Sequence, residues 1–309
     1  MAEVSVVIPT HNRWPMLQRA LASARGQEDV EVELIVIDDG STDETPSALA
    51  RIDDPRLRVL RNETGGGPAR ARNRGMAEAS GEWIAWLDDD DIWAPTKLRA
   101  QLDAAARTGA GFVWCSAFLI DGDGRTAGFE PAPAPDEFVR RVREWNPMPG
   151  GCSTAMARTD AVRVAGEFDP SLVFGEDWDY WIRILEHARP AAVDDVLAAY
   201  VVHTGSTILR AHDTALESLE RLAAKHRAEG EPDRFDRVAF SDWVAIGLRR
   251  EGRRMDAARL LARVARSERS VKAAGLAART LLGDWAVELP RRRWRAPTPP
   301  RPTWLDAAV

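Results

Sequence analysis

The chain has 309 residues, of which 45% are hydrophobic and 29% are charged, and its net charge at pH 7 is −6. This composition is ordinary for a globular protein, and the acidic balance argues against a general nucleic-acid binder. Two cysteines, Cys115 and Cys152, exclude a disulfide framework, and no apolar stretch reaches the ~18 residues that a transmembrane helix needs.

The first part of the chain alternates short apolar runs with helical patterns. Strands are predicted at 4–9, 33–37, 57–60 and 83–87, and helices at 14–25, 44–51 and 69–79. This rhythm predicts an α/β fold with a mostly parallel, Rossmann-like sheet and right-handed crossovers. Ligands bind at the carboxyl ends of the strands in such sheets, and Asn12, Asp39 and the aspartates at 88–91 fall there.

The second part is less regular, and it ends in helices. It predicts a helix at 97–108, a strand at 111–120, a hairpin turn at 121–124, a strand at 152–157, helices at 159–165 and 175–188, and strands within 191–202. Four helical patterns follow at 211–228, 234–251, 255–267 and 271–282. We therefore expect an α/β domain at 1–205, an all-helical extension at 206–289, and a Pro- and Arg-rich tail at 290–309. Residues 290–302 of this tail are expected to lie extended or disordered.

Four consecutive aspartates directly follow the predicted strand at 83–87. Adjacent carboxylates repel one another strongly unless a positive charge lies among them. A divalent metal is the simplest candidate, and hard oxygen ligands suit Mg²⁺ or Mn²⁺. The alternative is a solvated acidic loop, which would not need an apolar strand and two tryptophans beside it.

Five short motifs together resemble a family 2 glycosyltransferase over about residues 3 to 205. They are Pro-Thr-x-Asn at 9–12, Asp-Asp-Gly-Ser-Thr-Asp at 38–43, Ala-Arg-Asn-x-Gly at 71–75, Trp-Leu-Asp-Asp-Asp-Asp at 86–91 and Gly-Glu-Asp-Trp at 175–178. The resemblance implies the GT-A fold, with a nucleotide-binding half at about 1–95 and an acceptor-binding half at about 96–205. It also implies an inverting transfer from a nucleotide-sugar.

The resemblance assigns the nucleobase to the end of the first strand. Pro9, Thr10, His11 and Asn12 would meet the base, although His11 stands where relatives often have Tyr and is equally suited to cap the next helix. Asp39 matches the carboxylate that accepts the imide N–H of the base. Since a carboxylate is an acceptor only, this favours uracil or thymine, and hence a UDP-sugar.

The resemblance also assigns the diphosphate and ribose side. Asp88 and Asp89 would contact the ribose or bridging water, and Arg72 would support the ribose or the acidic loop, unless it forms a surface ion pair. Asp90 is expected to bind Mn²⁺ or Mg²⁺. His203 would be a second metal or diphosphate contact, or a structural histidine. Asp91 is expected to cap the turn at 92–97.

Proton removal from the acceptor hydroxyl needs a general base. The resemblance places this base at the start of the predicted helix at 175–188, with Asp177 as the first candidate and Glu176 as the second. Trp178 and Trp181 would wall the sugar or acceptor site, or they would be core residues one turn apart.

The resulting prediction is an inverting, metal-dependent glycosyltransferase that uses a UDP-sugar. Its acceptor hydroxyl would belong to a natural product, a peptide, a glycan or a lipid-linked intermediate, and the C-terminal helices would shape the acceptor site or form a homo-oligomer interface. Because the N-terminus lacks the basic region of a secretory signal, we expect a cytoplasmic protein, or one held peripherally at the inner membrane surface. The alternatives are a sugar-nucleotidyltransferase and a non-catalytic nucleotide-sugar-binding module of the same fold.

Overall fold

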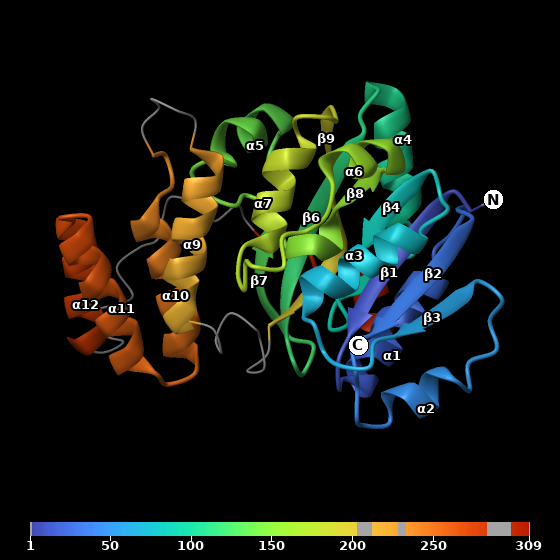
Figure 1. Ribbon diagram of the computed structural model, residues 1–309, viewed down its shortest axis with the longest axis horizontal. Helices are drawn as coiled ribbons and strands as arrows, with labels where there is room; N and C mark the ends of the chain where they lie inside the picture. Colours follow the sequence, from blue (N-terminus) through green and yellow to red (C-terminus); the bar gives the residue numbers. More distant parts are fainter. Residues whose placement is uncertain (1, 203–211, 228–232, 283–297, 309) are drawn as a thin grey trace.

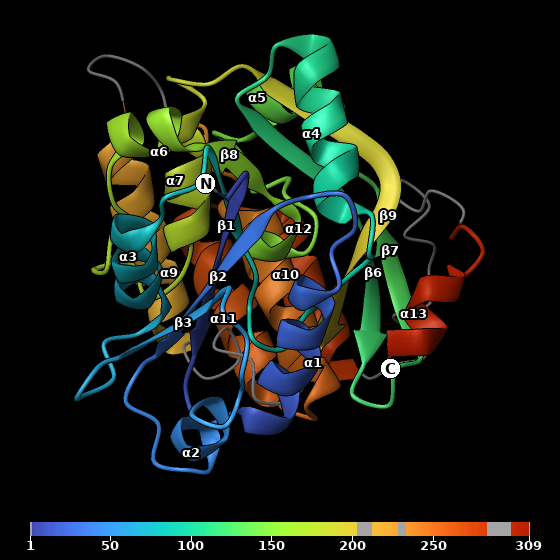
Figure 2. The same ribbon diagram turned by 90° about the vertical axis from the view of Figure 1, so that its right-hand side faces the viewer.

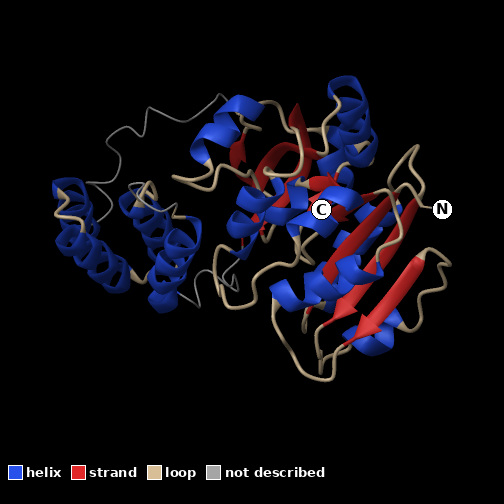
Figure 3. Ribbon diagram, turned by 45° about the horizontal axis from the view of Figure 1, so that its top comes forward, coloured by secondary structure: helices blue, strands red, loops and turns tan. Residues whose placement is uncertain are grey.

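A computed structural model describes residues 2–202, 212–227, 233–282 and 298–308 (Figure 1). Within these residues, nine strands form one sheet in the order β3-β2-β1-β4-β8-β6-β9-β5, and β7 pairs with β6. The strands are β1 (Val4–Thr10), β2 (Val32–Asp38), β3 (Leu57–Arg61), β4 (Trp83–Trp86), β5 (Ile92–Trp93), β6 (Phe112–Asp121), β7 (Thr126–Glu130), β8 (Met156–Arg158) and β9 (Pro190–Val202). Helices lie on both sides of this curved sheet (Figure 3).

The N-terminal half of the sheet is parallel, as the alternation of strands and helices predicts. β1 pairs in parallel with β2 and β4, and β2 pairs in parallel with β3. Side chains of β1 and β2 alternate between two hydrophobic cores, one under α1 (Trp14–Arg25) and one under α3 (Pro68–Glu78). Gly75 is needed for this packing, because a Cβ there would lie 2.5 Å from a methyl group of Val7. α2 (Thr45–Leu49) follows β2.

The C-terminal half of the sheet is mixed. β8 is antiparallel to both β4 and β6, whereas β6 and β9 run parallel. Its helices are α4 (Lys97–Thr108), α5 (Pro135–Arg141), α6 (Thr159–Ala165) and α7 (Glu176–Ile184).

The predicted strand at 152–157 is partly wrong. Residues Gly151–Thr154 form a 3-10 helix, and only β8 that follows is extended. Gly150 and Gly151 have φ angles of +56° and +59°, so the chain turns sharply just before this segment. The prediction also left out α5, β5 and β7, which are short.

The predicted helical extension is present as α9 (His212–His226), α10 (Arg237–Arg250), α11 (Arg254–Ser267) and α12 (Val271–Leu282). These helices lie beyond α7, at the end of the molecule opposite β3 (Figure 1). Leu219, Val244 and Leu261 belong to the same hydrophobic core as Trp86 and Trp181. The extension therefore shares a core with the α/β part, and the boundary expected near residue 205 lies outside the described residues.

The last residues of the tail, beyond the stretch at 290–302 that is expected to be extended or disordered, form a helix. α13 (Thr303–Ala308) lies beside β6 and β7 (Figure 2), and Leu305 is fully buried against Phe118 and Val201. The Arg301 guanidinium donates a hydrogen bond of 2.7 Å to the Gly124 carbonyl oxygen. This short segment packs through two apolar residues, Trp304 and Leu305. The overall Pro- and Arg-rich composition of the tail does not indicate this packing.

Candidate active site

The ends of β1 and β4 are tied together at the aspartate run. Thr10 Oγ1 donates a buried hydrogen bond of 2.7 Å to the Asp89 carboxylate. The Asp88 backbone N–H donates to Ser153 Oγ at 3.0 Å, which brings in the 3-10 helix. The carboxyl ends of neighbouring strands thus meet at one edge of the sheet, as predicted.

Two arginines supply positive charge to the aspartate run. Arg13 Nη1 lies 3.1 Å from Asp89 Oδ1 and 2.9 Å from Asp90 Oδ2, and Arg72 Nη2 lies 2.6 Å from Asp88 Oδ1. Burial, reinforced by the negative charge of Asp90, still raises the pKa of Asp89 to about 6. The repulsion among the carboxylates is therefore offset by arginines, and repulsion alone does not require a metal.

Asp91 has a different place from its neighbours. Its carboxylate is fully buried and accepts hydrogen bonds from Ser153 Oγ and from the Val201 backbone N–H. Burial and the adjacent negative charges raise its pKa well above the usual range. The expectation that Asp91 caps the turn at 92–97 is wrong, because Asp91 instead fastens the end of β9 to the 3-10 helix.

The expected base-binding loops are cross-linked. Asn12 has a left-handed backbone with φ of +56°, and its side-chain oxygen accepts from the backbone N–H groups of Thr42 and Asp43 at 2.7 and 3.2 Å. His11 Nδ1 lies 2.7 Å from the Asp39 carbonyl oxygen. Pro9 is buried within β1 opposite Ile37. The strand end and the loop after β2 therefore form one unit.

Asp39 is buried and already well bonded. Its Oδ1 accepts from Asn62 Nδ2 at 2.6 Å, and its Oδ2 accepts from the backbone N–H groups of Gly66 and Gly67, both at 2.8 Å. The preceding Asp38 braces the same loop through Arg61 at 2.8 Å. The glycine run thus closes over the Asp39 carboxylate.

Arg72 joins the two halves of the α/β domain. Its side chain is 5% exposed and bridges Asp88 to Glu176, whose Oε1 lies 2.9 Å from Arg72 Nη1. The guanidinium also lies over the ring of Phe168 at 5.5 Å, and Asn73 holds the Phe168 backbone with two hydrogen bonds. The surface ion pair considered for Arg72 is excluded by its burial.

Glu176 and Asp177 open α7 directly across from the aspartates. Burial and the adjacent Asp177 raise the pKa of Glu176 to about 7, although Arg72 opposes this shift. Burial also raises the pKa of Asp177, whose carboxylate accepts from Asn146 Nδ2 at 3.2 Å and from the Trp178 backbone N–H at 2.7 Å. Elevated pKa values suit a group that accepts a proton near neutral pH.

Trp178 and Trp181 are core residues. Their exposed fractions are 1% and 0%, and the Trp178 indole N–H donates to the Val142 carbonyl oxygen. Trp181 packs on Phe112 with ring centroids 5.3 Å apart. The expectation that these two rings wall the sugar or acceptor site is therefore wrong, and their one-turn spacing reflects the core.

Another aromatic cluster is connected to the acidic pair through Asn146. Trp145 adjoins Asn146, which holds Asp177, and its ring centroid lies 6.3 Å from that of Trp243 on α10. Phe174 lies 5.6 Å from Trp243, which is 36% exposed. The sequence gives no periodic signal for this cluster, because its members come from two loops and a distant helix.

Arg13 and Tyr200 are further site residues that sequence reasoning missed. Arg13 directly follows the Pro-Thr-x-Asn motif, so its position near that strand end was the one sequence signal that it could reach the aspartates. Burial and the aspartates raise the pKa of the Tyr200 hydroxyl well above its usual range. Nothing in the β9 sequence indicates this influence of the aspartates on Tyr200, because the register of β9 against β6 shifts between Val193 and Ala198.

Within residues 2–202, 212–227, 233–282 and 298–308, no group of three or more His, Cys, Asp or Glu side chains is arranged to hold a metal ion. His203 lies outside the described residues. None of the helices in this same part of the chain is long and apolar enough to cross a membrane.

The sequence model of the family described as "Glycosyl transferase family 2" matches residues 5–164, which is slightly more than half of the chain. The chain belongs to glycosyl transferase family 2. It is a glycosyltransferase, and the family resemblance predicted from the five motifs is confirmed.

Curated relatives carry sugar-transfer names. The chain is 40% identical over 124 residues to the succinoglycan biosynthesis protein ExoO of Rhizobium meliloti, a match that covers 40% of this chain and 36% of that relative. It is 29% identical over 191 residues to the Escherichia coli UDP-Glc:alpha-D-GlcNAc-diphosphoundecaprenol beta-1,3-glucosyltransferase WfgD, covering 62% of this chain and 73% of WfgD.

Solved structures share the fold. S. aureus TarS 1-349 in complex with UDP-GlcNAc aligns with a TM-score of 0.56 at 18% identity, covering 90% of each chain. The Pyrobaculum calidifontis mannosyltransferase PcManGT, in complex with GDP-Man and Mn²⁺, aligns with a TM-score of 0.58 at 20% identity, covering 93% of this chain and 82% of PcManGT. The expected GT-A fold with C-terminal helices is confirmed.

Proposed function

We propose that this enzyme transfers a sugar from a UDP-sugar to a hydroxyl group of a lipid-linked sugar, with inversion at the anomeric carbon. The observation that carries the proposal is the Arg72 bridge, which holds Asp88 of the donor half and Glu176 of the acceptor half on one guanidinium. In this proposal Asp88 serves the nucleotide and Glu176 lies on the acceptor side, and the shared guanidinium puts both acids at one site. The names of WfgD and TarS support a UDP-linked donor, and the name of WfgD supports a lipid-linked acceptor.

On the donor side, Asp39 is the base-selecting residue. An ionised carboxylate can accept about four hydrogen bonds. Asp39 uses three of them for Asn62, Gly66 and Gly67, which leaves capacity for one more donor such as the uracil imide N–H. Pro9, Thr10, His11 and Asn12 form the adjoining wall of the base site.

Asp90 would hold Mn²⁺ or Mg²⁺, with Asp88 and Asp89 directed to the ribose. These carboxylates fit a hard cation, which is commonly held by one or two carboxylates together with substrate phosphates. Bound there, the cation would neutralise the diphosphate and favour its departure. Arg13 pairs with Asp90 in this structure, so Asp90 would exchange that partner when the donor binds.

On the acceptor side, Asp177 takes the proton from the attacking hydroxyl group. A bond forms between the acceptor oxygen and the anomeric carbon while the bond from that carbon to the diphosphate oxygen breaks, so UDP leaves from the opposite face. Asn146 orients the Asp177 carboxylate. Glu176 is the alternative base, but its ion pair with Arg72 ties it to a structural role.

The test combines UDP binding with transfer to GlcNAc-diphosphoundecaprenol in the presence of Mn²⁺. Asp177→Asn is expected to keep UDP affinity and to lower transfer by about 10²–10⁴-fold. Asp90→Asn is expected to weaken Mn²⁺-dependent UDP binding, while Asp160→Asn, at an exposed ion pair with Arg158, serves as the matched control. The proposal would be refuted if the wild-type protein neither bound nor used UDP-sugars, or if the transfer product retained the anomeric configuration of the donor.

A further inference from the structure

The two helices at the far end of the molecule are basic although the chain is acidic. Residues 254–282, which form α11 and α12, contain seven Lys or Arg and two Asp or Glu, a net charge of +5 in a chain of net charge −6. Both acids are ion-paired, Asp256 with Arg253 at 2.9 Å and Glu268 with Arg237 at 3.6 Å. The charge of the molecule is therefore strongly uneven.

The basic side chains lie on the outer side of this helix pair. α11 and α12 stand at the end of the molecule, with α9 and α10 between them and the sheet (Figure 1). Leu260, Leu261 and Val264 of α11 are buried. The exposed basic side chains are Arg254, Arg259, Arg263, Arg266, Arg269 and Lys272.

Apolar side chains are exposed on the same helix pair. Val271 is 87% exposed, Leu281 58% and Leu282 62%, whereas Ala273 and Ala277 of α12 are buried. Met255, at the start of α11, is 57% exposed. A solvated helix face normally carries charged residues, so exposed aliphatic side chains within a basic surface indicate a binding surface.

We infer that the outer surface of α11 and α12 binds the anionic surface of a phospholipid bilayer. Basic side chains are attracted to anionic headgroups, and aliphatic side chains between them can enter the boundary with the acyl chains. An acidic protein would match the charge but not the large exposed aliphatic groups beside it. The inference rests on the proposed function, because a lipid-linked acceptor lies in a bilayer and the enzyme must approach it there.

The experiment measures co-sedimentation of the full chain with vesicles of phosphatidylcholine alone or mixed with phosphatidylglycerol. Binding is expected to need phosphatidylglycerol and to weaken as salt is added. The triple variant Arg263→Gln, Arg266→Gln, Lys272→Gln is expected to weaken partitioning about a hundredfold, at about fivefold per charge. The triple variant Val271→Ser, Leu281→Ser, Leu282→Ser is expected to weaken it at least ~10-fold.

Matched controls place the same changes on the α/β part. They are Arg107→Gln, Arg140→Gln, Arg163→Gln for charge, and Val59→Ser, Val139→Ser, Val164→Ser for exposed apolar groups. Both controls should bind vesicles like the wild type. The inference would be overturned if the control variants lost as much vesicle binding as the α11–α12 variants. It would also be overturned if the protein bound both vesicle types equally or bound neither. A dimer seen by light scattering that only the serine variant disrupts would likewise overturn it.

The outcome is separable from that of the proposed function. UDP affinity, measured by calorimetry without vesicles, should be unchanged in both α11–α12 variants because these helices are distant from the aspartates. Vesicle binding without any transfer would refute the proposed acceptor and leave the bilayer surface standing. Sugar transfer by a protein that does not bind anionic vesicles would refute the bilayer-binding surface and leave the proposed function standing.

Discussion

Arg72 lies between carboxylates from two different segments of the chain and is almost completely buried. A guanidinium suits this place because its fork can donate to Asp88 and Glu176 at once, while its face rests on Phe168. Two acids whose charges would repel each other are thereby held close together. Arg72 thereby helps to fix the position of α7 relative to β4.

Arg72→Met is expected to lower the free energy of unfolding by about 3–5 kcal/mol, because removal of one partner leaves buried carboxylates uncompensated. Urea unfolding followed by fluorescence measures the change. Arg70→Met is the matched control on the same helix, since Arg70 is exposed and its replacement should cost less than about 0.5 kcal/mol. Equal stability of the two variants would contradict the bridging role.

The pKa of Glu176 gives a pH-dependent stability. Its folded value of about 7 lies above the ordinary value of 4.5, so between these values the folded protein holds the proton more tightly than the unfolded chain. The free energy of unfolding should therefore fall as pH rises from about 4.5 to 7, by about 3 kcal/mol from this group. Glu176→Gln should lack this decline when both proteins are unfolded in urea between pH 5 and 8. A constant difference between them would show that Glu176 is not protonated in the fold.

For single residues, the positions at strand ends were predictable from the sequence, but the side-chain pairings were not. Asp39 and Asp88 follow unambiguous apolar runs, so their place at the sheet edge follows from the pattern. Arg13 and Arg72 became partners of the aspartates through tertiary contacts across 76 and 16 residues, which no local spacing encodes. Trp178 showed the same limit, because an i, i+3 pair of tryptophans fits a core and a sugar site equally well.

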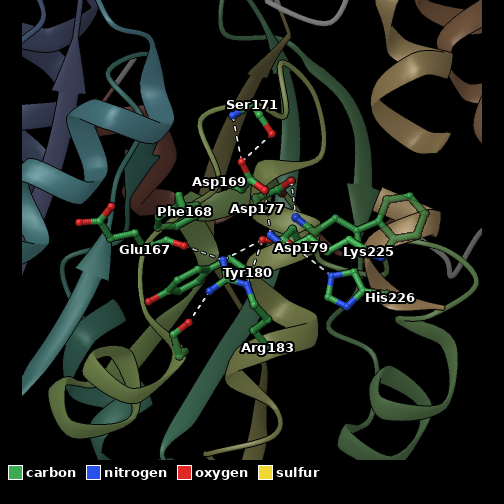
Figure 4. A network of polar contacts seen from close by, with 12 residues as sticks. Glu167, Phe168, Asp169, Ser171, Asp177, Asp179, Tyr180, Arg183, Lys225 and His226 are labelled. Atoms are coloured by element: carbon green, nitrogen blue, oxygen red, sulfur yellow. Dashed lines mark hydrogen bonds and ion pairs between the residues drawn. The ribbon is translucent and has the colours of Figure 1, made fainter. Parts of the chain in front are cut away.

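Between elements, α7 is fastened to the helical extension by a buried ion cluster (Figure 4). Asp179 is fully buried, and its Oδ2 pairs with Arg183 Nη2 at 2.7 Å. Its Oδ1 lies 2.9 Å from Lys225 Nζ and 2.8 Å from His226 Nε2, both on α9. Lys225 also reaches Asp169 at 2.9 Å. The helix that presents Asp177 is thus held in position by α9.

Acid should weaken this attachment. The hydrogen bonds and cations at Asp179 outweigh burial and lower its pKa from 3.8 to about 2. Stability from this group is present above the unfolded value and is lost as pH falls through about 2. Asp179→Asn should therefore cost about 2 kcal/mol at pH 7, and the difference from wild type should shrink as pH falls from 5 towards 2.

The control for Asp179 is Asp160→Asn, which removes an exposed ion pair with Arg158 and should change stability by less than about 1 kcal/mol. Urea unfolding at several pH values compares the three proteins. If the Asp179 difference were independent of pH, the cluster would act through packing and not through charge.

Helices and strands were largely predictable where their pattern of apolar residues extends over many positions. β1, α4 and α11 follow their predicted ranges closely, because β1 is a continuous run of buried residues and each helix has several turns of them. β5 has two residues and β8 has three, which is too short for a period to be recognised. β8 pairs antiparallel with both β4 and β6 and comes after a sharp turn at Gly150 and Gly151, and sequence alone could not give its direction.

Across the whole molecule, one hydrophobic core crosses the expected domain boundary. Val7 of β1, Trp86 of β4 and Trp178 of α7 belong to the same contiguous cluster as Leu219 of α9 and Leu261 of α11. Composition changes sharply near residue 205, which favoured separate domains at the level of sequence. Packing instead joins the helices to the α/β part in one hydrophobic core.

A shared core predicts a single cooperative unfolding transition. Leu261 is fully buried on α11, and Leu261→Ala should cost about 2–5 kcal/mol by loss of contacts and creation of a cavity. In calorimetry the whole transition should move down by about 4–15 °C and stay single, because the sheet loses its packing partner together with α11. Val164→Ala, at a position that is 66% exposed on α6, should leave the transition in place. Two transitions, of which only the smaller one moves, would instead mean that the helices fold independently, and the network at Asp179 would then be a surface contact between two domains.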